Sequence, residues 1–361
     1  NAGFVAKGYA AGEVALAKKL GLSHARHLVA LTKNARKIIK KRIVEFDIDC
    51  GPVIDGVLTV SWRDNPSDVQ NYIDEANRDF DLGFEFWPRE RVREHCKTQR
   101  YFDGVYSPND FQFNPLRYVH GLARAVTAKG GKIFEHTPAL KIFREGKSWV
   151  VQSMHGRVKA QHIVLCCAIY SDGLDRRLEN AVIPVQTYIT VTKPIDPAVL
   201  KTAIDTPHAI YDMRFCSDYY RILPDNRLLW GGRVGLLAHP SNIAEAMMQD
   251  MFRVYPQLAG HVTPEVSWSG YLAYPAHKMP QIGMMDEGYW YNTGYGGHGL
   301  CPTTAGGEAV AAAIAEGDTT YQQFAPFAVS KYGFSYVGGK ISRYAAQGVY
   351  LWWRLRDYFQ T

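Results

Sequence analysis

The chain has 361 residues, of which 47% are hydrophobic and 21% are charged. This length exceeds the usual size of one compact domain and the composition excludes a disordered protein, so we expect two lobes with sizeable cores. The formal net charge is +6, from 41 Lys and Arg against 35 Asp and Glu spread along the chain, which excludes a separate basic domain but is compatible with either an anionic ligand or nucleic acid.

Membrane and metal signals are absent from the sequence. No window reaches about 18 uninterrupted apolar residues, and the opening NAGFVAKGYA lacks the apolar core of a signal peptide. The six cysteines form no CxxC pair and no metal-type spacing with histidine, so we expect reduced thiols and no metal site. Together these features predict a cytoplasmic protein without a transmembrane segment.

Residues 11–45 carry apolar side chains at helical spacing, with lysines and arginines between them. The pattern predicts a long amphipathic helix, broken at Gly21. Its basic face has two interpretations, a surface for nucleic acid or an ordinary solvated face, and the second is the commoner case.

The next segments alternate between strand and helix. The pattern predicts a strand over 56–62, a helix from Pro66 to about residue 80, a second helix over 116–129 and a strand over 132–136. A glycine stop separates the second helix from its strand. This order is typical of an α/β layer.

From residue 140 the chain becomes rich in strands. Residues 140–167 predict a β meander, and the run 163–168 is apolar on both faces, as expected of a strand in the middle of a sheet with Cys166 and Cys167 buried. Residues 182–270 are again rich in strands, with one amphipathic helix near 241–254. The two lobes are therefore expected to be interleaved along the chain.

The most informative segment is 288–317, in which an aromatic strand runs into a glycine-rich turn and a helix of small residues. Gly294, Gly296 and Gly299 formally match G-x-G-x-x-G, but no second strand ending in an acid follows about 20 positions on, as the dinucleotide motif requires. Glycines allow close approach to the backbone, and a helix N-terminus favours negative charge on a phosphate or on the edge of a reduced flavin. The alternative is a tight connection without a ligand.

The turn Gly294–Leu300, followed by Thr303–Gly306, resembles the C-terminal flavin-binding segment of the D-amino-acid-oxidase-type FAD-dependent oxidoreductases, closest to the γ-glutamylputrescine oxidoreductase branch. Other stretches resemble this family in order and spacing. They are Phe113–Leu116, Glu135–Ala139, Ile163–Ser171, Tyr219–Arg221, Trp230–Arg233 and Pro280–Gly283. Together they span nearly the whole chain.

The resemblance implies a mixed α/β fold in which an FAD-binding lobe is interleaved with a mixed-sheet substrate-binding lobe. The FAD-binding lobe is expected over 1–45, 100–180 and 270–325, the substrate-binding lobe over 46–99 and 181–269, and a helical extension over 326–361. Chains of this family open with a βαβ unit that grips the pyrophosphate. This sequence begins inside the turn after that unit, so the unit is expected to be missing from it.

The resemblance also assigns cofactor contacts. The residues expected to bind FAD are Asn1, Ala2, Gly3, Thr137, Pro138, Ala139, Cys167, Ala168, Gly294, Tyr295, Gly296, Gly297, His298, Gly299 and Leu300. Some members attach the flavin through a cysteine shortly before the P-x-I-G loop, and the matching place here is near Gly270, with Cys301 offset from it. We therefore expect non-covalent FAD.

The reaction implied by the family is oxidation of an amine carbon to an imine, with O2 or a quinone as electron acceptor. His298, Arg221, Arg233 and Tyr271 are the candidate catalytic or substrate-binding residues, the arginines as clamps for a carboxylate. Three interpretations stay open: an FAD amine oxidase or dehydrogenase that binds no nucleic acid, a flavin-dependent tRNA-modifying enzyme, and a non-catalytic relative.

Overall fold

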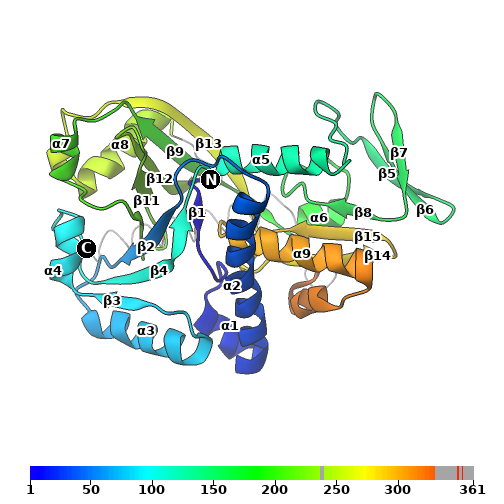
Figure 1. The fold of residues 1–361 in the computed structure, drawn as a ribbon, viewed down its shortest axis with the longest axis horizontal. Coiled ribbons are helices and arrows are strands. Elements are labelled where there is room, and N and C mark those ends of the chain that lie inside the picture. Colours follow the sequence, from blue (N-terminus) through cyan, green and yellow to red (C-terminus); the bar gives the residue numbers. More distant parts are fainter. Residues whose placement is uncertain (236–239, 330–347, 349–351, 353–361) are drawn as a thin grey trace.

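The computed structural model describes residues 1–235, 240–329, 348 and 352 (Figure 1). Within that part of the chain, the strands form one nine-stranded mixed sheet and two three-stranded sheets. The elements follow in the order β1 (Phe4–Val5), α1 (Glu13–Leu20), α2 (Leu22–Glu45), β2 (Ile54–Val60), α3 (Pro66–Phe80), β3 (Glu85–Trp87), α4 (Arg89–His95), β4 (Gly104–Gln112), α5 (Pro115–Ala128), β5 (Lys141–Glu145), β6 (Ser148–Gln152), β7 (Arg157–Ala160), β8 (Ile163–Leu165), α6 (Arg176–Asn180), β9 (Ile183–Thr192), α7 (Pro197–Lys201), β10 (Ala209–Asp212), β11 (Tyr219–Ile222), β12 (Leu228–Gly235), α8 (Ile243–Val254), η1 (Pro256–Leu258), β13 (Pro264–Tyr274), β14 (Gln281–Asp286), β15 (Tyr289–Thr293), α9 (Leu300–Glu316) and η2 (Thr320–Phe327).

The long helix predicted at the start is two helices, α1 and α2, and the break at Gly21 is confirmed. Gly21 has φ 83°, a conformation that L side chains rarely adopt, and it ends α1 while it precedes the first turn of α2. The bend lets both helices turn buried faces toward one core, which also holds Tyr9 and Ile282.

Helices α3 and α5 begin where the sequence predicts them. Asn65 accepts a hydrogen bond from the backbone N–H of Asp68, and Asn114 accepts from those of Leu116 and Arg117. In each helix a proline follows the cap at the first helical position, where its missing N–H costs nothing.

The large sheet has the order β1-β4-β2-β10-β11-β12-β9-β13, with β3 beside β4. Its side chains alternate between two faces, as the period of a strand requires. One face, with Tyr220 and Trp230, packs against α8 and α4. The other face, with Ile189 and Leu229, packs against Ala2 at the start of the chain. The N-terminal segment therefore lies on the side of the sheet away from α8.

A smaller sheet with the order β14-β15-β8 stands beside the large one. Strand β15 pairs with β14 antiparallel and with β8 parallel, and α9 follows β15 and packs against α2 (Figure 1). The predicted meander is confirmed for β5, β6 and β7, which form the third sheet.

Two strand predictions are wrong. Residues 132–136 contain no strand; Glu135 and His136 form a turn in which His136 has φ 53°. The run 163–168 does not lie mid-sheet: only 163–165 form β8, which pairs with β15 alone among the described strands, and Val164 is 39% exposed. A central strand needs a partner strand on each side. Among the described residues, β8 has one partner strand, and residues 132–136 have none.

The large sheet also draws on segments expected in the FAD-binding lobe. Strand β1 comes from 1–45 and β4 from 100–180, and both pair within that sheet. The lobe boundaries stay a prediction. The extension predicted over 326–361 lies almost entirely outside the described residues.

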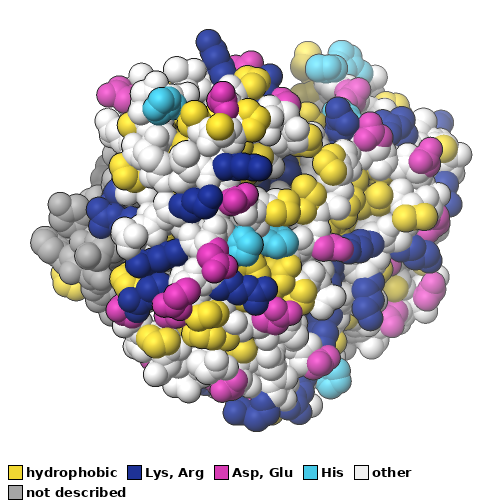
Figure 2. All heavy atoms as spheres, turned by 60° about the vertical axis from the view of Figure 1, so that its left-hand side comes forward, with side chains coloured by type: hydrophobic (Ala, Val, Ile, Leu, Met, Phe, Trp, Pro, Cys, Tyr) yellow, Lys and Arg dark blue, Asp and Glu magenta, His cyan; other side chains and the backbone are white. Residues whose placement is uncertain are grey.

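The surface mixes charges of both signs. On the face drawn in Figure 2, Lys and Arg side chains are interspersed with Asp and Glu rather than gathered in one basic patch. Six basic residues of α2 are paired with acids on neighbouring elements or on α2 itself. These pairs are Arg26–Asp79, Lys33–Asp81, Arg36–Asp110, Lys40–Asp55, Lys41–Glu45 and Arg42–Glu308. Within the described part of the chain, no helix is long and apolar enough to cross a membrane.

Candidate functional site

The pairing of β8 with β15 places two predicted cofactor segments at one edge. The strands are adjacent and parallel, with Leu165 opposite Tyr291. Their carboxyl ends therefore meet at the same edge of the sheet, where open α/β sheets bind ligands. The segment after β8 holds Cys167 and Ala168, and the turn Gly294–Gly299 follows β15.

The glycine turn adopts backbone conformations that exclude side chains. Gly294, Gly296 and Gly297 have φ of 72°, 60° and 87°. A Cβ on Gly296 would lie 3.2 Å from the Cβ of Ala10, and one on Gly294 would lie 3.2 Å from Oε1 of Gln281. Glycine is therefore required for two reasons: the backbone has positive φ angles, and neighbouring residues leave little room for a side chain.

Polar groups without partners surround this turn. Gly299 precedes α9 without a side-chain cap, and the first turn of α9 has no acidic residue, so its N–H groups and positive dipole end are not neutralised from within the helix. Oε1 of Gln281 and Oγ1 of Thr293 are buried without a hydrogen-bond partner among the described residues. Buried polar atoms are normally satisfied, so their orphan state indicates a ligand or water at this edge.

The start of the chain lies against the same turn. Nε2 of His298 is 3.1 Å from the carbonyl oxygens of both Ala6 and Lys7, so this nitrogen carries the proton and donates to the backbone. A hydrogen bond from Phe113 N to Gly3 O joins the chain start to the end of β4. These contacts hold residues 3–10 between the large sheet and the glycine turn.

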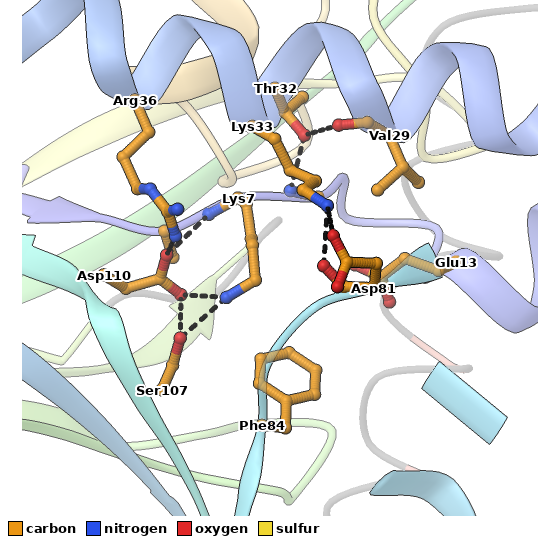
Figure 3. A network of polar contacts seen from close by, with 12 residues as sticks. Lys7, Glu13, Val29, Thr32, Lys33, Arg36, Asp81, Phe84, Ser107 and Asp110 are labelled. Carbon is orange, nitrogen blue, oxygen red and sulfur yellow. Dashed lines mark hydrogen bonds and ion pairs between the residues drawn. The ribbon is translucent and has the colours of Figure 1, made fainter. Parts of the chain in front are cut away.

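A buried polar network fixes that segment (Figure 3). Lys7 Nζ donates to Ser107 Oγ at 2.7 Å and contacts Asp110 Oδ2 at 3.2 Å, while Arg36 Nη1 lies 2.8 Å from Asp110 Oδ1. Thr32 accepts from the backbone N–H of Gly8. Burial lowers the pKa of Lys7, and the Asp110 carboxylate partly offsets this. The network ties the segment to both β4 and α2.

Glu13 lies at the edge of this network with its carboxyl group buried. Burial raises the pKa of Glu13. Its Oε2 accepts a 3.4 Å hydrogen bond from the hydroxyl of Tyr72, and its Oε1 lies 2.2 Å from where a Cβ on Gly8 would be. Gly8 is thus another position where only glycine fits.

The family described as FAD dependent oxidoreductase matches residues 1–313 of this chain. The chain belongs to this family. It is therefore an enzyme whose cofactor is FAD. Among curated relatives, it is 26% identical over 330 residues to the probable oxidoreductase OrdL of Haemophilus influenzae, covering 90% of this chain and 74% of the relative. It is 25% identical over 361 residues to the gamma-glutamylputrescine oxidoreductase of Escherichia coli, covering 99% of this chain and 83% of the relative.

Solved structures of similar fold support the architecture. The L-proline dehydrogenase of P. horikoshii superimposes with a TM-score of 0.72 at 17% identity, covering 85% of this chain and 83% of that chain. Glycine oxidase from Bacillus cereus gives 0.71 at 16% identity, with coverages of 89% and 85%. The mixed α/β fold predicted from the sequence is confirmed.

The residues at the glycine turn of this oxidoreductase fit a flavin. An uncapped helix N-terminus, a turn that excludes side chains and two orphan polar atoms suit a planar group whose edge is polar and becomes negative on reduction. The backbone N–H groups of Leu300 and Cys301 are the donors that would face that edge.

The other predicted cofactor residues divide into two groups. Ala2 packs against Ile189 and Leu229 of the large sheet, and Gly3 accepts a hydrogen bond from Phe113; the contacts of the N-terminal segment with the glycine turn are made further along, at Ala6 and Lys7. Residues 137–139 lie in a largely exposed loop before β5. Their role in binding FAD stays a prediction, as does that of Asn1.

The expectation that Cys166 and Cys167 are buried is wrong. Both are exposed and unbridged at the end of β8, where Ala168 has φ 52°. The apolar pattern of the strand ends at Leu165, and the chain after it leaves the sheet. Cys301 is instead fully buried in the core with Phe111 and Tyr118, and burial raises its thiol pKa.

The two arginines predicted to clamp a substrate carboxylate form ion pairs or hydrogen bonds within the fold. Arg233 has φ 49° and pairs with Asp250 of α8. Arg221 is 6% exposed; its Nη2 donates to the carbonyl of Phe113 at 3.0 Å and its Nη1 to Gln112 Oε1 at 3.3 Å. Burial lowers the pKa of Arg221 to about 10. These contacts tie both guanidinium groups to neighbouring parts of the fold, and their role as carboxylate clamps stays a prediction.

Strand β13 brings Leu272 and Tyr274 to the glycine turn. Leu272 Cδ1 lies 3.3 Å from where a Cβ on Gly297 would be, and Tyr274 Cε2 lies 3.7 Å from the corresponding point of Gly296. Tyr271 alternates to the opposite face of β13 and is 41% exposed. The sequence reasoning missed Leu272, because period-two alternation places Leu272 and Tyr274 on one face of β13 but only the fold shows that this face meets the turn.

Proposed function

We propose that this FAD-dependent oxidoreductase oxidises the C–N bond of a small amine to an imine, which water hydrolyses to an aldehyde or keto product. The substrate classes we consider are a γ-glutamylated polyamine, an amino acid and an N-methylated amine. The similar proteins support an amine or an amino acid as the substrate, because they include a gamma-glutamylputrescine oxidoreductase, a glycine oxidase and an L-proline dehydrogenase.

The observation that carries the proposal is the uncapped N-terminus of α9 behind the glycine turn. Its first-turn N–H groups have no side-chain acceptor in the described chain, and the turn excludes side chains that would block access. Such donors stabilise negative charge that develops during a reaction without having to reorganise. The first-turn N–H groups of α9 would supply such donors to the edge of a bound flavin.

FAD supplies the acceptor of the hydride when it is bound. The chain's own residues would bind and orient the two reactants. His298, through its hydrogen bonds to Ala6 and Lys7, holds the turn against the N-terminal segment, and Leu272 and Tyr274 form an apolar wall beside it. A wall of this kind favours the neutral amine, the form that gives up a hydride.

The test uses the purified protein saturated with FAD. Under anaerobic conditions, a panel of γ-glutamylputrescine, sarcosine, proline, glycine and putrescine is added in turn, and flavin absorption is followed. Bleaching by at least one amine, together with the matching aldehyde or keto product, is the expected result. Flavin that stays oxidised with every amine contradicts the proposal.

Two further readouts refine this assignment. Hydrogen peroxide formed after air is admitted identifies O2 as the acceptor, whereas turnover only with an added quinone identifies a dehydrogenase. Acid precipitation should leave all flavin in the supernatant, because Cys301 is enclosed in the core and no cysteine stands near Gly270. Flavin in the pellet contradicts non-covalent binding.

A further inference from the structure

Two adjacent cysteines lie exposed at the edge that holds the glycine turn. Cys166 and Cys167 directly follow β8, whose carboxyl end lies beside that of β15. Both thiols are free and both residues are exposed, whereas three of the other four cysteines are buried and Cys216 is half-buried. Cys166 and Cys167 are therefore the cysteines that a reagent in solution reaches most readily.

Cys166 lies close to the glycine turn itself. Burial raises the pKa of Tyr295, and the thiol of Cys166 adds to this shift, so the two side chains lie within range of each other's charge. The hydroxyl of Tyr295 donates to Oδ1 of Asn292 in β15. A chemical change at Cys166 therefore acts beside the residue that links the glycine turn to β15.

The two thiols are suited to different steps of an oxidation. Burial on one side, with a smaller effect from Cys167, raises the pKa of Cys166, so this thiol keeps its proton at neutral pH. The thiolate is the form of cysteine that attacks a peroxide. The reaction therefore begins at Cys167, and Cys166 is the neighbouring thiol that attacks the oxidised sulfur.

A disulfide between these neighbours requires the backbone to change. Adjacent Cα atoms are about 3.8 Å apart, whereas disulfides normally join Cα atoms about 4.4–6.8 Å apart. The resulting strain makes such a disulfide easy to reduce. The backbone after the pair forms a turn, in which Ala168 has φ 52° and the N–H of Tyr170 donates to the carbonyl of Cys167 at 2.8 Å. Closing the disulfide would therefore distort the segment in which Cys167 and Ala168 are expected to contact FAD.

We propose that Cys166 and Cys167 form a reversible oxidation site at the cofactor edge, where a hydroperoxide joins them as a disulfide that weakens the binding of FAD. With hydrogen peroxide, the Cys167 thiolate attacks one oxygen: an S–O bond forms, the O–O bond breaks, and the departing hydroxide takes a proton to become water. Cys166 then attacks that sulfur, so that an S–S bond forms, the S–O bond breaks and a second water leaves. The two thiols lose two electrons, which reduce the peroxide.

The first test identifies the product of oxidation. The purified protein, with and without added FAD, is treated with hydrogen peroxide, remaining thiols are alkylated, and the mass of the tryptic peptide 160–176 is measured. We expect this peptide to lose about 2 Da relative to its dithiol form and to become a dithiol again with dithiothreitol. Saturating FAD should slow the loss, because two states that exclude each other are coupled in both directions.

Two variants make this test specific. Cys166→Ser should form a sulfenic acid on Cys167 that dimedone traps, because the second thiol is missing. Cys216→Ser, which removes the half-buried thiol between β10 and β11, should form the disulfide as the wild type does. A wild-type peptide that stays a dithiol, or that gains oxygen without forming the disulfide, would overturn the proposal.

The second test measures the effect on the cofactor. FAD is titrated into reduced and into peroxide-treated protein, and the quenching of flavin fluorescence gives Kd. We expect Kd to rise about 5-fold or more on oxidation and to return with dithiothreitol, in the wild type and in Cys216→Ser. Equal Kd values for the dithiol and disulfide forms would overturn the proposed effect on FAD. No amine is present in either test, so these outcomes do not depend on the proposed amine oxidation.

Discussion

His277 links the acid stability of the protein to the turn beside the glycine segment. Its Nδ1 accepts a 3.1 Å hydrogen bond from the backbone N–H of Met279, and its ring lies 5.1 Å from that of Phe327. Burial, with a smaller effect from Lys19, lowers the pKa of His277 to about 4. A proton on Nδ1 would remove the acceptor that Met279 uses.

The pH dependence of stability follows from this shift. Between the unfolded pKa of about 6.5 and the folded value, the unfolded chain binds more protons, so the contribution of His277 is complete above about pH 6.5 and is lost as pH falls toward 4. We expect His277→Asn, which keeps an acceptor but does not titrate, to flatten this part of the curve of Tm against pH. Parallel curves for wild type and variant would contradict the assignment.

Gly296 is the position at which a side chain should interfere most with the cofactor. Its φ of 60° and the 3.2 Å approach of Ala10 make Gly296→Val strained by about 1–3 kcal/mol. We expect the purified variant to hold at least ten-fold less FAD per chain, measured by the ratio of flavin to protein absorption.

Gly307 provides the matched control. It lies in α9, and a Cβ there would meet nothing within 4 Å. Gly307→Ala should keep full flavin content and raise the free energy of unfolding by up to about 1 kcal/mol, because alanine favours the helix. Equal flavin loss in both variants would mean that α9, rather than the turn, controls binding.

At the scale of elements, the carboxylate of Asp110 joins strand β4, helix α2 and the N-terminal segment. Asp110, on β4, holds Lys7 of the N-terminal segment and Arg36 of α2, and the Lys7 and Asp110 side chains are 1% and 5% exposed. Asp110→Ala should lower the free energy of unfolding by about 3–5 kcal/mol, because it leaves a buried lysine without its partner. Urea unfolding measures the difference.

An exposed ion pair of α2 gives the comparison. The Lys40–Asp55 pair is 44% and 58% exposed, so Asp55→Ala should cost at most about 1 kcal/mol. A loss from Asp110→Ala no larger than this would show that the network does not fasten the segment. Further pairs along α2, such as Lys33–Asp81 and Arg42–Glu308, join basic residues of this helix to acids on neighbouring elements.

For the whole molecule, FAD should act as a stabilising ligand. A ligand that binds only the folded state adds RT ln(1 + [L]/Kd), about 2.7 kcal/mol when its concentration is 100 times Kd. We expect the Tm of the flavin-free protein to rise steadily as FAD is added, and Gly296→Val to shift far less over the same range. A Tm that ignores FAD in the wild type would contradict a cofactor site at this turn.

Local signals in the sequence were sufficient for most elements. Gly21, Asn65 with Pro66, and the glycines of 294–299 encode a helix break, a helix start and a tight turn through their own dihedral preferences and side-chain hydrogen bonds. These preferences act within a few residues, so the fold confirms them. The likeness to the FAD-dependent oxidoreductases rested on the same short segments and is confirmed over residues 1–313.

What the fold alone decided depends on pairs of residues far apart in the chain. Three findings follow from which strands become neighbours: the hydrogen bond of Arg221 to Phe113, the pairing of Arg233 with Asp250, and the exposure of Cys166. A residue type fixes what charge or hydrogen bond a side chain offers. Only the packing of distant segments decides whether a partner is already there, as it is for Arg221 at Phe113 and for Arg233 at Asp250.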